Sequence, residues 1–173
     1  MKKPIYFLLI LIFASCHLKE QEKSSKTYFD LVSYFKAETI RLTKSNPIVD
    51  KTVNVNGKLE NKKIKITNWE HEFSEFTDAD INKTSWRGSF RSNITPQHSI
   101  YTSDNVKFPI KRLEVNFKDN KVIGIRIFST NINDLYTSQD SLTYFPDSVY
   151  EIKKMQKIKL MNEKRYEVIG KFK

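Results

Sequence analysis

The chain has 173 residues, of which 39% are hydrophobic and 29% charged, and it contains only 4 Gly and 5 Pro. This balance is typical of one globular domain and excludes a disordered or collagen-like chain. The mean hydropathy of −0.54 excludes a polytopic membrane protein, and the formal net charge of +10 raises the question of an anionic partner.

The first fifteen residues predict a signal for export. A short basic start with Lys2 and Lys3 precedes a nearly unbroken apolar run over residues 5–14. A helix needs about 20 apolar residues to cross a bilayer, so this run is too short for a permanent membrane span. We therefore predict a secretory signal peptide over residues 1–15.

The apolar run ends in Phe13-Ala14-Ser15-Cys16, which resembles the lipobox of bacterial lipoproteins, although the first apolar position of that motif is more often Leu. The resemblance implies that the Cys16 thiol receives a diacylglyceryl group, that the chain is cut before Cys16 and that the new N terminus is acylated. Cys16 is the only cysteine, so disulfides within one molecule and cysteine metal sites are excluded. The alternative is an ordinary cleaved signal followed by an incidental cysteine.

The segment after Cys16 is polar and lacks periodicity, so we predict a lipidated flexible tether over residues 16–27 and a single domain over residues 28–173. Removal of residues 1–15 leaves a formal charge of +8. Export makes nucleic acid an unexpected partner and favours anionic lipid head groups or glycans. The lysines are spread along the chain, which also fits an ordinary solvated surface.

Residues 28–42 have the spacing of an amphipathic helix that ends at Asn46-Pro47. Phe29 and Ile40 lie outside its main apolar stripe. We expect them to form a second edge covered by another element, and the alternative is an edge exposed to a partner. The main stripe consists of Tyr28, Leu31, Val32, Phe35, Thr39 and Leu42.

Residues 52–66 contain Asn56-Gly57, a pair suited to a type I′ turn, and therefore predict a β-hairpin. Asn68 is a favourable cap for a second helix, with Glu70 and Glu72 in its first turn. The buried face of this helix is predicted to consist of Trp69, Phe73 and Phe76.

Two segments imitate metal sites. The sequence H-E-F-S-E from His71 to Glu75 comes one residue short of the zincin signature H-E-x-x-H, because Glu75 replaces the second histidine. Helical geometry directs His71 and Glu75 away from the apolar face, so we expect both to point to water. Residues 78–82 imitate the start of a calcium loop, but Lys83 and Ser89 replace its glycine and its last glutamate, which favours a turn.

From residue 110 the apolar period is two. A three-residue loop over 119–121 matches both faces of a hairpin. Its predicted pairs are Leu113 with Ile127, Val115 with Ile125, Phe117 with Ile123 and Glu114 with Arg126.

The C-terminal part predicts a turn at residues 146–148, a strand over 149–161 and a final hairpin with a loop over 162–164. The same pairing logic places Ile158 opposite Val168 and Lys159 opposite Glu167.

The order of elements predicts an α+β fold, with two amphipathic helices in the N-terminal half packed on a curved antiparallel β-meander. The chain also resembles the small lipoproteins common in Bacteroidota, on the segments 76–86 (FTDADINKTSW) and 142–148 (LTYFPDS). This resemblance implies a place in the cell envelope, at the outer membrane, and implies no activity.

The sequence contains no nucleophile elbow and no phosphate-binding loop, so we predict no catalytic residue, no cofactor and no metal site. The leading hypothesis is a non-enzymatic binding or structural module, held at the bilayer by acylated Cys16, with another envelope protein, glycan or lipid as its partner. A hydrolase would need acidic or histidine side chains that converge in a cleft. The remaining alternative is a carrier of an apolar ligand or lipid, with aromatic residues lining a curved sheet: Phe90, Tyr101, Phe108, Tyr136, Tyr144, Phe145 and Tyr150.

Overall fold

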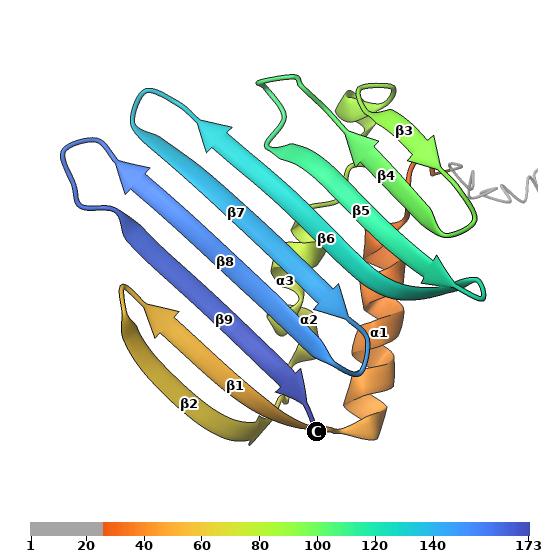
Figure 1. Ribbon diagram of the computed structural model, residues 1–173, viewed down its shortest axis with the longest axis vertical. Coiled ribbons are helices and arrows are strands. Elements are labelled where there is room, and N and C mark those ends of the chain that lie inside the picture. Colours follow the sequence, from red (N-terminus) through yellow and green to blue (C-terminus); the bar gives the residue numbers. More distant parts are fainter. Residues whose placement is uncertain (1–25) are drawn as a thin grey trace, which may run out of the picture.

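The computed structural model describes residues 26–173, so the predicted signal peptide, Cys16 and most of the predicted tether lie outside the described residues. Its main element is one open antiparallel sheet of nine strands, with the helices behind one face (Figure 1). The strands are β1 (Ile48–Val55), β2 (Lys58–Lys65), β3 (Arg91–Ile94), β4 (His98–Thr102), β5 (Ile110–Lys118), β6 (Lys121–Ile132), β7 (Tyr136–Phe145), β8 (Val149–Ile158) and β9 (Lys164–Phe172). The helices are α1 (Leu31–Ser45), α2 (Trp69–Glu72), α3 (Ser74–Asp78) and the 3-10 turn η1 (Thr84–Trp86).

The sheet combines a meander with one added hairpin. Strands β3 to β9 lie side by side in chain order, and the β1–β2 hairpin attaches to the last strand, giving the order β2-β1-β9-β8-β7-β6-β5-β4-β3. The register between β1 and β9 runs from Val49 opposite Phe172 to Val55 opposite Tyr166. The hairpin around Asn56-Gly57 is confirmed, because Val55 and Lys58 close it as partners.

Helix α1 begins three residues after the predicted start at Tyr28. Asp30 caps it, because its carboxylate accepts a hydrogen bond from the backbone N–H of Ser33 at 3.1 Å. The helix ends at Ser45, and its C-cap Asn46 adopts a left-handed φ of 47°, which asparagine tolerates better than most residues. The residues of α1 that are fully buried are Leu31, Phe35 and Leu42.

The two residues of the predicted second edge, Phe29 and Ile40, lie in different environments. Phe29 is half-buried, with its ring centroid 5.7 Å from that of Tyr34 and 6.2 Å from that of Phe117 on β5. Ile40 is 64% exposed, and Val32, which was expected in the buried stripe, is 40% exposed. The expected cover therefore exists at Phe29 and is missing at Ile40 within the described chain.

The predicted second helix is divided into the short helices α2 and α3. Asn68 caps α2 as expected, accepting a hydrogen bond from the backbone N–H of His71 at 2.9 Å. The backbone at Phe73 leaves the helical geometry, with φ −99° and ψ 10°, and α3 starts at the next residue. The predicted buried face is confirmed, because Trp69, Phe73 and Phe76 are all buried.

Aromatic rings fill the space between the helices and the sheet. Phe73 is fully buried, and its ring lies 5.2 Å from Phe35 of α1, 5.3 Å from Trp69 of α2 and 5.4 Å from Tyr144 of β7. Edge-to-face contacts of this kind contribute about 0.5–1.5 kcal/mol beyond area burial. Phe76 of α3 packs on Phe35 at 4.8 Å, so these rings join three helices and the sheet into one core.

The predicted hairpin of β5 and β6 is correct except near its turn. As expected, Leu113 faces Ile127, Val115 faces Ile125 and Glu114 faces Arg126. Closer to the turn Phe117 faces Val122 rather than Ile123. Asp119 and Asn120 form a tight turn with φ values of 51° and 60°, and a bulge takes up the extra residue.

The predicted register of the last hairpin is wrong. Strand β8 ends at Ile158 rather than at Met161, and Ile152, not Ile158, faces Val168. Lys153, not Lys159, faces Glu167. The turn at residues 146–148 is confirmed, with Asp147 at φ 56°.

Candidate binding surface

The zincin-like segment fastens the short helices to the sheet. The Glu72 carboxylate lies 2.6 Å from the Lys51 ammonium of β1, and Glu75 forms an ion pair with Lys154 of β8. His71 is exposed, as predicted. The Glu75 side chain is 42% exposed, so it reaches water as predicted, but the sheet also supplies a lysine that pairs with it.

Two buried tyrosines also hold helix glutamates on the sheet, through hydrogen bonds from their hydroxyls. Tyr150 donates a hydrogen bond to Glu72 at 2.6 Å, and Tyr144 donates one to Glu38 of α1. Burial, followed by these hydrogen bonds, raises the pKa of both Tyr144 and Tyr150 above the ordinary tyrosine value. Arg41 also pairs with Glu38, through two hydrogen bonds of 2.9 and 2.8 Å. Both carboxylates are therefore engaged in holding helices on the sheet.

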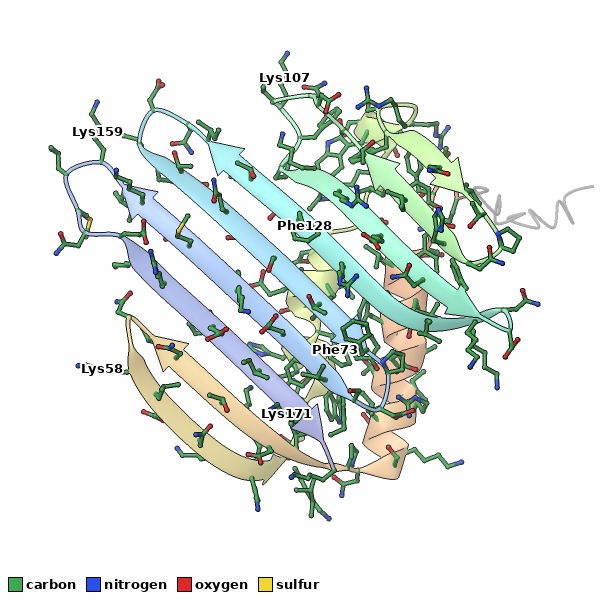
Figure 2. All side chains as sticks on the ribbon, viewed as in Figure 1. Lys58, Phe73, Lys107, Phe128, Lys159 and Lys171 are labelled. Carbon is green, nitrogen blue, oxygen red and sulfur yellow. The ribbon has the colours of Figure 1, made fainter. Side chains whose placement is uncertain are left out.

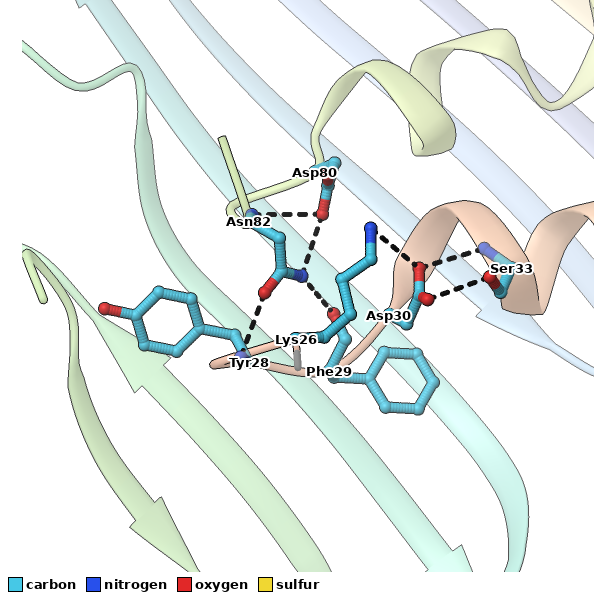
Figure 3. Close-up of polar contacts among 7 residues, drawn as sticks. All are labelled: Lys26, Tyr28, Phe29, Asp30, Ser33, Asp80 and Asn82. Atoms are coloured by element: carbon cyan, nitrogen blue, oxygen red, sulfur yellow. Dashed lines mark hydrogen bonds and ion pairs between the residues drawn. The ribbon is translucent and has the colours of Figure 1, made fainter. Parts of the chain in front are cut away.

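The calcium-like segment is a turn stabilised by its own side chains, as expected (Figure 3). Asp80 accepts hydrogen bonds from the backbone N–H and the side-chain amide of Asn82, at 3.1 and 3.0 Å. Asn82 in turn accepts from the Tyr28 backbone N–H and donates to the Phe29 carbonyl, both at 3.0 Å. The turn therefore ties the start of the domain to the segment after α3.

The acidic residues of the described chain do not converge on a metal or a cleft of substrate size. Residues 26–173 contain no group of three or more His, Asp or Glu side chains that could hold a metal ion. Burial raises the pKa of Asp140, which accepts a hydrogen bond from the Ser129 hydroxyl at 3.4 Å. The hollow beside Asp140 and Glu75 measures about 140 Å³, whereas small-molecule pockets usually measure about 300–1,000 Å³.

The face of the sheet opposite the helices carries a row of mostly polar side chains. No described helix covers this face, and Phe128 on β6 is 43% exposed there (Figure 2). Adjacent strands lie about 4.8 Å apart, so the six members of the row span roughly 24 Å. Following the register across six strands, the row consists of Arg112, Phe128, Ser141, Lys153, Glu167 and Asn54.

This row forms much of the lining of a shallow hollow of about 780 Å³, which we call the open-face hollow. A second row continues it toward the strand ends with Thr130, Gln139, Met155 and Arg165. A neighbouring hollow of about 850 Å³ shares Thr130 and extends over the ends of β4 and β5. Both volumes lie in the range of ligand sites, although the surface is open rather than enclosed.

Basic side chains outnumber acidic ones in the lining of these two hollows. Lys153 lies 2.8 Å from Glu151 and 3.3 Å from Glu167, and its hydrogen bond to Glu151 raises its pKa. The acidic side chains on the open face are Asp104 and Glu167, and the basic ones are Arg91, Lys107, Lys111, Arg112, Lys153 and Arg165. Lys154 and Asp140 also line the hollow, but their side chains lie toward Glu75 on the helix-covered face. The surface therefore suits an extended polar ligand with net negative charge.

The aromatic residues considered for an apolar carrier mainly belong to the packed core. Phe90, Tyr101, Tyr144 and Tyr150 are buried, and the other three of the seven are half-buried. Two hollows between the helices and the sheet measure only about 150 and 140 Å³. This filled core argues against a carrier that holds an apolar ligand beneath the helices.

No protein-family model matches this sequence, and the comparisons with curated proteins and with solved structures found no similar protein. Within residues 26–173, none of the helices has the length and the apolar character needed to span a bilayer. The candidate surface therefore rests on the geometry of this chain alone.

Sequence reasoning named Gly57 and Glu167 as parts of hairpins but assigned no residue of the open-face hollow to binding. The row is assembled by the register of six strands, and its members are spread from Asn54 to Glu167. The alternation of buried and exposed residues within each strand was the available signal. Without the correct pairing of β8 with β9, that signal does not place Lys153 beside Glu167.

Proposed function

We propose that this protein is a non-enzymatic lipoprotein of the bacterial envelope, anchored at the outer membrane through acylated Cys16, that binds another envelope component on the open face of its sheet. The observation that carries the binding role is the open-face hollow of about 780 Å³, with its row of polar and basic side chains. The anchoring role is supported by the export signal and the lipobox-like end at Cys16.

The two faces of the sheet suggest a division of labour for this function. We propose that α1 and the pair α2–α3 act as two amphipathic covers that close one face, and that this leaves the other face for the partner. The lysine and tyrosine contacts of Glu72 support this role for α2, since they hold it on the sheet. A rigid sheet positions a binding surface more precisely than loops do.

A carrier of an apolar ligand draws less support. The interior beneath the helices is filled by rings such as Phe73, and the larger hollows lie on the polar face. Phe128 and Met155 provide some apolar surface there, but charged side chains flank them. A hydrolase also draws little support, because the carboxylates of Glu72 and Glu75 are each paired with a lysine.

The anchoring part is tested by intact-mass analysis of the protein from its producing cell, compared with the Cys16→Ser variant. We expect the mass of a diacylglyceryl-modified chain beginning at Cys16, and we expect the variant to leave the membrane fraction. An unmodified thiol, or a variant that stays equally membrane-bound, would contradict the proposal.

The binding part is tested by placing a photo-crosslinking amino acid at Phe128 in the full lipidated chain. The matched control carries it at Ile40, since both positions are exposed apolar side chains on opposite sides of the molecule. We expect adducts with an envelope component in intact cells from position 128 and not from position 40. Equal adducts from both positions, or none from position 128, would rule out the open face as the binding surface.

A further inference from the structure

The first described residues are held against one edge of the sheet. Tyr28 is buried, with its ring centroid 5.5 Å from Phe90 and 5.4 Å from Tyr101, and its hydroxyl accepts a hydrogen bond from the Phe90 backbone N–H at 3.2 Å. Its own backbone N–H donates to Asn82, as drawn in Figure 3. The chain toward residue 16 therefore leaves the domain beside residues 82–91, next to β3 and β4 (Figure 1).

The surface at this exit is basic. Residues 81–103 contain no Asp or Glu, and Lys83, Arg87 and Arg91 of this stretch are all exposed. Arg91 pairs with Asp104, whose carboxylate lies 2.6 Å from its guanidinium, and the Lys83 ammonium donates a 3.4 Å hydrogen bond to the Asp78 backbone carbonyl. Lys83 and Arg87 have no ion-pair partner within residues 26–173.

An aromatic residue and an exposed apolar loop lie among these cations. The Lys83 ammonium stands 4.5 Å from the Trp86 ring centroid, and Trp86 packs on Phe108 at 5.1 Å. This contact brings in the loop before β5, in which Val106 is 87% exposed and Lys107 is exposed as well. Tryptophan beside lysine and arginine is a combination typical of membrane interfaces.

We propose that Lys83, Trp86, Arg87, Arg91 and Lys107, which we call the tether-side surface, rest on a bilayer containing anionic phospholipid. This inference depends on the proposed acylation of Cys16, which brings the bilayer to this edge of the molecule. Phosphate head groups would pair with the cations, and Trp86 would lie at the level of the head groups.

The length of the tether supports this orientation. Ten residue steps separate Cys16 from Lys26, which span at most about 35 Å when fully extended. The opposite edge strand, β2, lies eight strand spacings from β3, or roughly 38 Å across the sheet. Strand β2 is also rich in lysine, with Lys58, Lys62, Lys63 and Lys65, but the anchor holds the other edge near the bilayer.

Tryptophan fluorescence provides the test, because Trp86 is half-buried whereas Trp69, the other tryptophan, is 1% exposed. The lipidated full chain is inserted into vesicles of phosphatidylcholine, with or without phosphatidylglycerol, that contain a brominated lipid as a quencher. The test variant is Lys83→Gln with Arg87→Gln. The charge-matched control is Lys58→Gln with Lys62→Gln, on the far edge of the sheet.

We expect quenching in phosphatidylglycerol vesicles for the wild type and for the control, with loss of most of it in the test variant and in high salt. In a parallel sedimentation assay without the lipid anchor, the Cys16→Ser chain carrying the test changes should bind these vesicles about tenfold or more weakly than Cys16→Ser alone, since each cation near the surface strengthens binding severalfold. Trp86→Phe should abolish the quenching, which would show that the quenched fluorescence comes from Trp86.

Equal quenching with and without phosphatidylglycerol, or an equal loss in the control, would overturn the tether-side surface. A lipidated wild type without quenching would do the same. Failure of the proposed anchoring has a different signature, because intact-mass analysis would then find Cys16 unmodified while the sedimentation assay still reports on the cations.

Discussion

The two faces of the sheet differ in how their side chains are used. On the helix-covered face, rings from three helices and several strands interlock, and the helix residues Glu38, Glu72 and Glu75 each meet a lysine or tyrosine of the sheet. On the open face, side chains such as Phe128 and Lys153 stay partly exposed and line a hollow. The comparison indicates that one face supplies most of the buried contacts, while the other remains available for the binding that we propose.

The largest contrast is expected from removing one ring on each face. Phe73→Ala should lower the free energy of unfolding by about 3–5 kcal/mol, because Phe73 is fully buried among five aromatic neighbours. Phe128→Ala should lower it by less than about 1 kcal/mol. Urea unfolding followed by circular dichroism measures both, and similar losses would contradict the division between the faces.

A smaller contrast is expected from adding one methyl group on each face. In Gly170→Ala the new carbon would overlap the ring of Tyr150, which is fully buried and cannot move away, so we expect a loss of about 1–3 kcal/mol. In Gly124→Ala it would approach Phe145 to 2.8 Å, and this half-buried ring can shift, so the loss should stay below about 1 kcal/mol. Thermal unfolding compares them, and equal losses would argue against a rigid helix-covered core.

A third contrast concerns hydroxyl groups. Tyr150→Phe removes the hydrogen bond to Glu72 and should cost about 1–2 kcal/mol of unfolding free energy. The control is Tyr136→Phe, since the Tyr136 hydroxyl makes a long 3.4 Å hydrogen bond to Asn131 at the surface, and its loss should be within the error of denaturant unfolding. A negligible effect at Tyr150 would mean that Lys51 alone holds Glu72.

The smallest effect at neutral pH is the dependence of stability on tyrosine ionisation. Burial raises the folded-state pKa of Tyr144 and Tyr150 above the unfolded value, which is about 10. Their contribution is therefore complete below about pH 10 and is lost as the pH rises above it, because the unfolded chain then releases protons that the folded chain keeps. Tyrosinate absorbance should rise for these residues only on unfolding, and their ionisation in the folded protein near pH 10 would contradict this.

Local sequence patterns predicted the elements in which apolar residues identify one face and charged residues identify the other. The β5–β6 register followed from apolar pairs such as Leu113 with Ile127 and from the charge pair Glu114 with Arg126. The bulge near Ile123 was missed, because the choice between a tight turn and a longer loop depends on backbone geometry at Asp119 and Asn120.

The error in the last hairpin has a simple physical reason. Ile152 and Ile158 are six residues apart, and so are Lys153 and Lys159, so a slip of six leaves every side chain on the same face. Both registers then satisfy the alternation. The pairing of Ile152 with Leu142 on β7 accompanies the observed register, and that contact is not visible in the hairpin sequence itself.

The candidate binding surface was not predictable for a related reason. The pairing of β1 with β9 joins distant parts of the chain, and strands β3 and β4 lie in a stretch for which no strand was predicted. By contrast, the turn around Asn82 and the cap at Asn68 depend on residues close in sequence, and both were predicted.

The position of β9 between β1 and β8 has a consequence for how the protein reaches its folded state. The N-terminal hairpin finds its partner only when the last residues of the chain are present, and such distant pairings make folding slow. If the chain is exported, as we propose, it has to remain unfolded until it has left the cytoplasm. The dependence of β1 on the distant β9 would help to postpone folding until translocation is under way.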